Sequence, residues 1–140
     1  MQVEPGLIKE PIQKLNHQTI AKSFINNFSN GLNFGIGFVD SFFDPNSLCS
    51  LYIHLNQSVD ITETVGYANL RNKLLTLGIK TFKYDKFVQT SQPMQETNLI
   101  VTVIGKASIN DKSYNFESVF ILKKNFTTYL VANYILQIFI

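Results

Sequence analysis

The stretch YNFESVFILKKNFTTYLVANYILQIF, residues 114–139, decides the fold. It holds two runs of alternating apolar residues, joined by the polar Lys123-Lys124-Asn125. An alternation with a period of two is typical of β-strands, and a short polar connection predicts an antiparallel hairpin. The second run is apolar on both faces, so each face of this predicted strand must be covered by something.

The same periodicity predicts further strands on the N-terminal side of this hairpin. A second short polar connection, Asn110-Asp111-Lys112, makes the last strands an antiparallel meander. Gly105 lies inside a strand pattern and indicates a bulge or a bend. The predicted strands are Cys49–Leu55, Val59–Val65, Ile79–Val88, Leu99–Ile109, Tyr114–Leu122 and Thr128–Ile138.

Three segments have helical periodicity. The first begins after a predicted N-cap at Asn16, has apolar residues four positions apart, and ends at Ser29-Asn30-Gly31. The second covers Phe38–Phe43 and closes at the proline-containing turn that follows it. The third runs from Tyr67 to Leu77, where the next residue is a glycine.

Helices segregated from an antiparallel sheet define the α+β class. We therefore predict a cone-shaped, strongly bent antiparallel sheet packed on N-terminal helices. Residues 1–14, with two prolines and a glycine, are predicted to form an irregular arm, and residues 15–140 a single domain.

Composition excludes several classes of partner. The chain has 12 basic and 10 acidic residues, a net charge of +2, and so lacks the basic face expected of a nucleic-acid-binding protein. No apolar run is long enough to span a bilayer, and the N-terminus lacks the apolar segment of a signal peptide. We therefore expect no membrane association, no direct contact with nucleic acid, and a location in the cytoplasm or nucleus.

Residues able to support catalysis are few. His54 and Asp85 are the candidates for a general base, which would have to lie inside the cone and have its pKa adjusted by burial. The single cysteine, Cys49, is on the apolar side of its strand and is predicted to be a buried, unreactive thiol. Two histidines and one cysteine lack metal-ligand spacing, so no metal or cofactor is expected.

Four stretches of this chain resemble the nuclear transport factor 2-like family. They are IAKSFINNF (20–28), GYANLRNKLLTLGIKTFKYDKFVQTSQP (66–93), LIVTVIGKASI (99–109) and the final hairpin, where Phe116, Phe120 and Asn133 occupy the family's positions. The resemblance implies a cone whose sheet pairs with a second copy or with a paralogous domain. It implies a non-catalytic interaction subunit with this predicted interface: Phe116, Phe120, Tyr129, Val131, Asn133, Ile135, Gln137 and Phe139.

The departures from the family indicate which of its roles this chain has. In the family's import factor, the resemblance places contacts to Ran-GDP on an acid in the first strand and on an acidic loop. Here Leu51-Tyr52 replaces the first, and the loop keeps only Asp111. His17 stands where an aromatic residue would grip Phe-Gly repeats of nucleoporins, and Gln137 where an arginine is usual.

These losses suit the small subunit of a messenger-RNA export heterodimer, which needs no contact to Ran and would work in the nucleus, the cytoplasm and at the nuclear pore. A homodimeric Ran-GDP import factor is the alternative. A domain serving another assembly, such as a ubiquitin-protease cofactor, also stays open. The third class is a small cone-shaped enzyme, a dehydratase or isomerase, that uses His54 or Asp85. Nucleoporin Phe-Gly repeats and Ran-GDP are the further partners that the resemblance implies.

Overall fold

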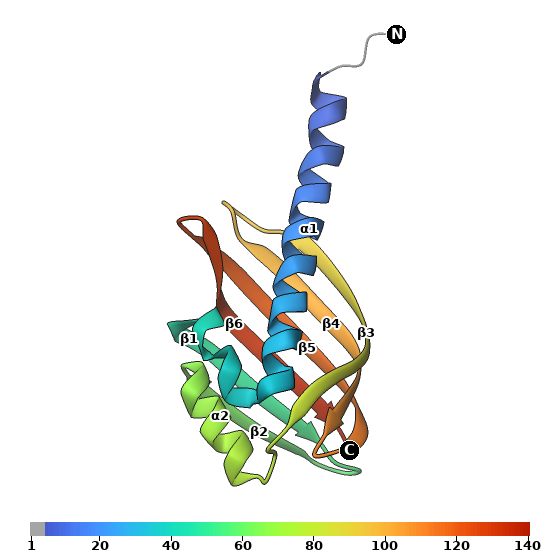
Figure 1. Ribbon diagram of the computed structural model, residues 1–140, viewed down its shortest axis with the longest axis vertical. Coiled ribbons are helices and arrows are strands. Elements are labelled where there is room, and N and C mark those ends of the chain that lie inside the picture. Colours follow the sequence, from blue (N-terminus) through green and yellow to red (C-terminus); the bar gives the residue numbers. More distant parts are fainter. Residues whose placement is uncertain (1–4) are drawn as a thin grey trace.

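The computed structural model describes the backbone of residues 5–140 and the side chains from residue 16 onward. Figure 1 shows α1 lying across one face of a curved sheet, with α2 near β1 and β2 at the end of the domain that carries the C-terminus. In order, the elements are α1 (Pro5–Phe34), the 3₁₀-helix η1 (Ile36–Phe42), β1 (Phe43–His54), β2 (Val59–Val65), α2 (Tyr67–Thr76), β3 (Phe82–Pro93), β4 (Leu99–Ile109), β5 (Lys112–Asn125) and β6 (Thr128–Phe139).

The strands form one sheet in the order β2-β1-β6-β5-β4-β3. Strands β3 to β6 are the predicted antiparallel meander. Strand β1, however, runs parallel to β6, so the sheet is mixed rather than wholly antiparallel. A parallel neighbour requires a long crossover connection, and the chain from β2 to β5 provides it. The α+β class and the bent sheet packed on the N-terminal helices are confirmed.

The first helix starts earlier than the sequence predicts. It begins at Pro5, so residues 5–14, expected to be an irregular arm, are helical, and Asn16 lies inside the helix rather than at its N-cap. Proline is well tolerated in the first turn because an N–H there has no partner within the helix. Residues 1–4 of the predicted arm lie outside the described residues.

The boundary between the helices and the sheet also differs from the prediction. Helix α1 continues through Ser29-Asn30-Gly31. Gly31 is needed for packing rather than for termination, because a Cβ atom there would lie 2.9 Å from Cγ1 of Val39 in η1. The segment Asp44-Pro45-Asn46 is already part of β1, in an irregular stretch where pairing with β6 is interrupted. Proline is accommodated there because such a stretch does not need every N–H for the ladder.

Two tight turns join the last three strands. The first is Asn110-Asp111, whose φ angles of 49° and 69° fit the type I′ turn favoured in two-residue hairpins. The Asn110 side chain accepts a hydrogen bond from the backbone N–H of Lys80 at 2.9 Å and donates one to the carbonyl oxygen of Gly78 at 2.6 Å. This turn therefore ties the β4–β5 hairpin to the segment that follows α2.

The second turn is Phe126-Thr127, which lies beyond the predicted Lys123-Lys124-Asn125. Both lysines belong to β5, where Lys123 forms an ion pair with Asp44. The hydrogen bond from this lysine, followed by one from the backbone N–H of Asn46, lowers the pKa of the Asp44 carboxyl. Phe126 has a φ of 58°, which is unusual for a bulky residue.

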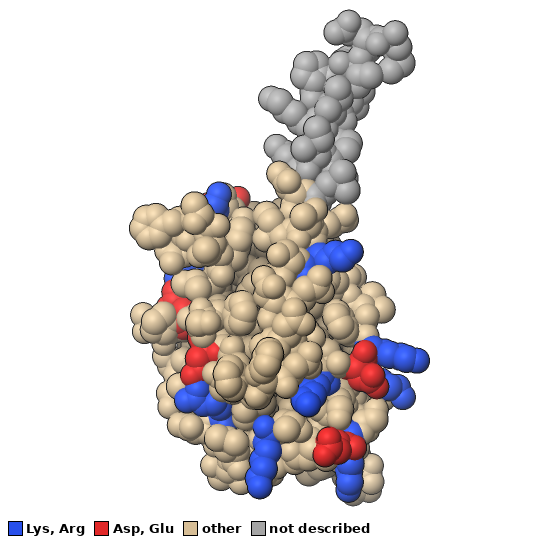
Figure 2. Space-filling model, viewed as in Figure 1, with Lys and Arg blue, Asp and Glu red and all other residues tan. Residues whose placement is uncertain are grey.

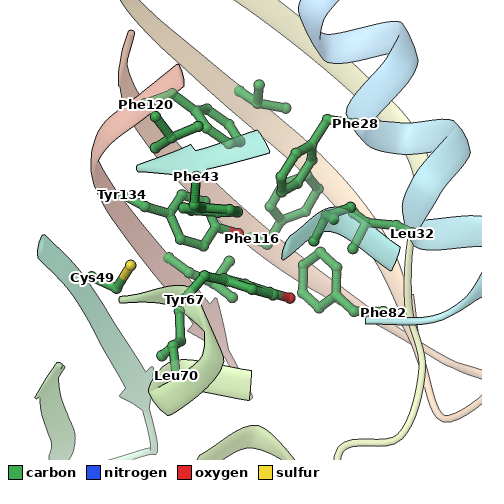
Figure 3. Packing of buried hydrophobic residues seen from close by; sticks show 14 of the residues in the cluster. Phe28, Leu32, Phe43, Cys49, Tyr67, Leu70, Phe82, Phe116, Phe120 and Tyr134 are labelled. Carbon is green, nitrogen blue, oxygen red and sulfur yellow. The ribbon is translucent and has the colours of Figure 1, made fainter. Parts of the chain in front are cut away.

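An aromatic cluster fills the space between α1 and the concave face of the sheet (Figure 3). The ring of Phe28 packs edge-on against Phe120, with centroids 5.0 Å apart, and also contacts Tyr134. The ring of Phe43 stacks on that of Tyr67, with centroids 4.3 Å apart. These rings are buried, and each aromatic side chain contributes a large apolar area to the core.

Gly105 confirms the bulge that the sequence predicts. Register between β3 and β4 shifts between Tyr84 and Lys86, so the extra residue on β3 is Asp85, opposite the step between Lys106 and Ala107 and close to the Phe87–Gly105 pair. A Cβ atom on Gly105 would lie 2.0 Å from the carbonyl oxygen of Lys86 and 2.6 Å from Cα of Phe87. Because both are backbone atoms, no side-chain rotation relieves the clash, and only glycine allows this bend of the sheet.

We predict that Gly105→Ala lowers the free energy of unfolding by about 2–3 kcal/mol, the cost expected of severe overpacking. Urea denaturation followed by circular dichroism measures it. Gly37→Ala is the matched control, because a Cβ atom there would lie 3.6 Å from the nearest atom, Cδ of Arg71. Equal stabilities of the two variants would contradict this role of the glycine.

Candidate interaction surface

The convex face of the sheet, which we call the outer sheet face, has no helix of residues 5–140 on it (Figure 1). Strand residues that alternate with the buried core positions point to this side, and cross-strand pairing brings them into continuous rows. In one row, Ile104, Glu117, Gln137, Tyr52 and Ile61 are successive neighbours across five strands. The apolar residues of the whole outer sheet face are Leu48, Tyr52, Val59, Ile61, Val65, Val88, Ile100, Ile104, Val119, Ile121, Ile135 and Phe139.

Large aliphatic side chains on this face are accessible to solvent. Ile104 is 55% exposed and Val88 is 69% exposed. A hollow of ≈ 460 Å³ lies between these two residues, Glu117 and Phe139. Large exposed apolar patches on soluble proteins are typical of interaction sites, and polar residues such as Glu117 and Gln137 lie between the apolar ones here.

The final strand supplies only part of this surface. Asn133, Ile135, Gln137 and Phe139 lie on the outer sheet face, as expected of interface residues. Val131 points the other way and is fully buried. The remaining predicted members are also on the inner side: Phe116 and Phe120 are buried in the aromatic cluster, and Tyr129 packs against the edge of the core.

A bulge explains why the predicted interface residues of β6 divide between the two faces. Ile121 pairs with Asn133, but the next residue, Leu122, pairs with Val131, so Ala132 is an extra residue in β6. Because side chains alternate along a strand, one extra residue exchanges the two faces on either side of it. Regular alternation through positions 129–139 therefore could not place all of them on one side.

The residues that sequence analysis missed are on the other strands of the outer sheet face. Val59, Ile61 and Val65 of β2 alternate with polar residues, which on its own suggests that they face the core, but all three are among the exposed apolar residues. The available signal was that β1 and β4 carry large apolar residues at both odd and even positions, so that neither face of these strands is polar.

His54, one of the two candidate general bases, lies on the outer sheet face rather than inside the cone. Its ring stacks on that of Phe139, with centroids 4.5 Å apart, and its Nε2 donates a hydrogen bond to Oε1 of Gln137 at 2.9 Å. Asp85, the other candidate, is exposed in the bulged part of β3. Both residues thus lie where the polar face of the first strand and the charged segment Lys83–Lys86 suggest, outside the cone, and neither is placed as the interior base that an enzyme of this shape would need.

Titratable groups in the cone interior are weak acids. Burial raises the pKa of Tyr67, Tyr84 and Tyr134 well above the usual range of a phenol. Burial also raises the pKa of the Cys49 thiol, as expected of an unreactive cysteine. Among the described side chains, the other buried polar residues are His17, whose Nδ1 lies 3.0 Å from Oγ of Ser91, and two serines.

A pocket of ≈ 440 Å³ opens at the end of the domain that carries the C-terminus. Most of its lining is aliphatic, including Ile53, Ile109 and Ile138, and Asp60, Asn110 and Lys112 are among its polar lining residues. Asp111, the predicted remnant of a Ran-contact loop, is exposed in the turn between Asn110 and Lys112 and does not line the pocket.

In the part of the chain that the structure describes, no group of histidine, cysteine, aspartate and glutamate residues is placed to hold a metal ion. No described helix is both long enough and apolar enough to cross a membrane.

These features define a class: an α+β domain whose bent sheet encloses an aromatic core and exposes an apolar outer face. Residues 20–138 match the model of the nuclear transport factor 2 (NTF2) domain, so the chain belongs to this family. A comparison with curated protein sequences finds no match.

Solved structures have the same fold. Nuclear transport factor 2 from Cryptosporidium parvum is similar with a TM-score of 0.70 at 21% identity, over 87% of this chain and 94% of that one. The Mtr2–Mex67 M domain complex of C. albicans gives 0.70 at 12% identity, over 88% and 94%. A ketosteroid isomerase-like protein from Erwinia carotovora atroseptica gives 0.55 at 12% identity, over 90% and 95%. The fold thus occurs in transport proteins and in isomerase-like proteins.

The buried tyrosines predict how stability depends on pH. Tyrosines in the unfolded chain ionise near pH 10, whereas the folded pKa values of Tyr67, Tyr84 and Tyr134 are higher. The stability linked to these groups is fully present below about pH 10 and is lost as the pH rises toward the folded values. We expect their phenolate absorbance at 295 nm to appear only in step with the loss of circular dichroism.

Tyr84→Phe is the matched variant, because the Tyr84 hydroxyl is buried without a hydrogen-bond partner among the described residues. It should leave stability at pH 7 nearly unchanged or raise it, and make the alkaline loss less steep. Ionisation of all six tyrosines before any change in circular dichroism would contradict their burial.

Proposed function

We propose that this chain is a non-catalytic interaction subunit whose outer sheet face is covered by a second NTF2-like domain. The exposed apolar rows of this face carry the proposal, because Ile104, Ile135 and Ile61 would otherwise stay in water. Covering this face answers the question raised by the final strand: its inner side packs on the aromatic core, and its outer side meets a partner.

The size of the face agrees with a stable interface. Six strands about 4.8 Å apart make it about 24 Å wide, and four outward-facing rows about 6.8 Å apart make it about 20 Å high. Its flat footprint of about 500 Å² corresponds to a larger accessible area once the side chains are counted. Specific protein interfaces bury about 800 Å² per partner, so this face is of the right order.

Within nucleocytoplasmic transport, we propose the role of the small partner in a messenger-RNA export heterodimer. The membership of the family and the likeness to the Mtr2–Mex67 complex support it. The lack of the acids expected for Ran contact also supports it, because Asp111 is the single carboxylate at its turn and a basic surface needs several acids for steering. The chain would then work in the nucleus, in the cytoplasm and at the pore.

A homodimeric Ran-GDP import factor is the second candidate. The aliphatic pocket beside Asp111 favours it, because that pocket is open to an apolar side chain from a partner. The likeness to nuclear transport factor 2 from Cryptosporidium parvum is compatible with it. An enzyme of the isomerase type has less support, because neither His54 nor Asp85 lies inside the cone.

We predict that Ile135→Asp prevents association through the outer sheet face. A charge in the middle of an apolar interface must be desolvated without a partner, so the dissociation constant should rise about 30-fold or more. Light scattering measures the mass of the purified chain, alone and after capture from extracts of its own cells. Leu75→Asp is the control, because Leu75 is a comparably exposed apolar residue on α2.

The unmodified chain distinguishes the two transport roles. A chain that aggregates or is monomeric alone, but is soluble with one larger partner, supports the export heterodimer. A homodimer that recruits Ran-GDP supports the import factor instead. The proposal would be contradicted if the unmodified chain is a soluble monomer that captures no partner, and if Ile135→Asp and Leu75→Asp leave its mass unchanged.

A further inference from the structure

The two edge strands of the sheet differ in how they are protected against pairing with another chain. In the order β2-β1-β6-β5-β4-β3, strands β2 and β3 each have one neighbour among the described strands. An edge strand presents a row of unpaired backbone N–H and C=O groups, and proteins usually blunt such an edge with lysine, proline, a bulge or a covering element. Strand β3 has these protections, and β2 lacks most of them.

Strand β3 is a poor template for a further strand. Lys83 and Lys86 are exposed on it, the bulge at Asp85 interrupts its register, and Pro93 is its last residue. Helix α1 also packs against it. Figure 2 shows basic side chains projecting from the margin of the molecule along which Figure 1 draws β3. Charge, bulge, proline and helix thus all oppose pairing at this edge.

Strand β2 has an edge of the opposite kind. Its seven residues, VDITETV, include no lysine, arginine or proline, and its register with β1 is regular from Val59 to Val65. Val59, Ile61 and Val65 are among the exposed apolar residues of the chain. A regular edge strand with exposed apolar side chains is a ready template for strand pairing.

Helix α2 leaves the edge of β2 open. The residues of β1 that face the inner side, Cys49, Leu51 and Ile53, are buried. Their partners on the same side of β2 are not, because Asp60 is exposed and Thr62 is half-buried. Helix α2 therefore lies over β1 and does not close the border of the sheet beyond β2.

The hydrogen bonds at the end of β2 show which of its backbone groups point outward. The N–H of Gly66 donates to the carbonyl oxygen of Ser47 in β1 at 2.7 Å. Hydrogen-bonded and non-bonded positions alternate along an antiparallel pair, so the even-numbered residues of β2 bond to β1. The N–H and C=O groups of Val59, Ile61 and Glu63 consequently point away from the sheet and are free to pair with another strand.

The charges of β2 restrict what can pair with it. Asp60 and Glu63 are exposed, and neither belongs to the two ion pairs found among the described side chains. They are three residues apart and so lie on opposite faces of the sheet. A strand with two basic residues three positions apart places one base opposite each acid, and such cross-strand pairs of opposite charge are favourable. A second copy of β2 would bring two further acids instead.

We propose that the edge of β2 binds an extended segment of a partner protein as a seventh strand of the sheet, and that this segment carries two basic residues three positions apart. Its backbone pairs with the outward groups of Val59, Ile61 and Glu63, and its two bases lie opposite Asp60 and Glu63. Because the border of the sheet is separate from the middle of the outer sheet face, this site does not depend on whether a second domain covers that face.

Hydrogen exchange of backbone amides, measured by NMR on the isotope-labelled chain, tests this inference. The probe is the blocked peptide Thr-Val-Lys-Val-Val-Lys-Val-Thr. We expect it to slow exchange at the outward amides of Ile61 and Glu63, whereas the amide of Thr62, already bonded to β1, exchanges slowly with and without it. A peptide with Glu in place of both lysines should bind at least about fivefold more weakly, because both cross-strand charge pairs are reversed. Thr-Val-Lys-Val-Lys-Val-Val-Thr, with its lysines two positions apart, should also bind more weakly.

Glu63→Pro is the blocking variant. Proline has no N–H and is tolerated on an edge strand where the N–H faces away from the sheet, so this variant should keep its fold. Glu63→Thr is the matched control, because it loses the same charge but keeps the outward N–H, and threonine favours strands. We expect the proline variant to lose the protection of Ile61, and the threonine variant to bind only about two- to threefold more weakly than the unmodified chain. Circular dichroism checks that both variants are folded.

The variant Ile135→Asp separates this inference from the proposed function. It disrupts the outer sheet face, and we expect it to leave the protection of β2 by the peptide unchanged. Equal binding by the two Glu63 variants, equal binding of the basic and acidic peptides, or no protection of Ile61 and Glu63 would overturn the inference. Protection of Ile61 that grows with protein concentration in the absence of peptide would show that a second copy pairs with β2, which would also overturn it.

Discussion

The packing of Phe28 against the concave side of the sheet is the interaction on which the rest of the structure depends. Its ring lies 5.0 Å from that of Phe120 and 6.1 Å from that of Tyr134, measured between centroids. A sheet can surround a helix in this way only if it bends, and the bulge beside Gly105 allows the bend. Bending places the aromatic residues of α1, η1 and the sheet on one side and leaves the convex side without a cover (Figure 1).

One broad surface follows from this arrangement. The outer sheet face carries exposed apolar side chains from several strands, and it suits a partner of similar shape and size. The interior behind it holds tyrosines with raised pKa values and a buried thiol.

Alternation in the sequence predicted the strands and the antiparallel meander of the last four, because period-two patterns persist through them, but it did not predict that β1 pairs in parallel with β6. The boundaries of Val59–Val65 and Leu99–Ile109 agree with β2 and β4. What local patterns could not give was the side to which residues point, since the bulge at Ala132 reverses the two faces within β6. For this reason Val131 was expected at the surface and is buried. Surfaces built from several strands depend on register, which no single segment encodes.

Photochemical carbene labelling of side chains tests the central claim most directly. It compares the isolated chain with the native assembly purified from its own cells, and mass spectrometry locates the labelled residues. The account predicts that Ile104, Ile135 and Phe139 are labelled in the isolated chain and protected in the assembly, while Leu75 on α2 is labelled equally in both. Equal labelling of the outer sheet face in the two samples would contradict the claim that a partner covers it.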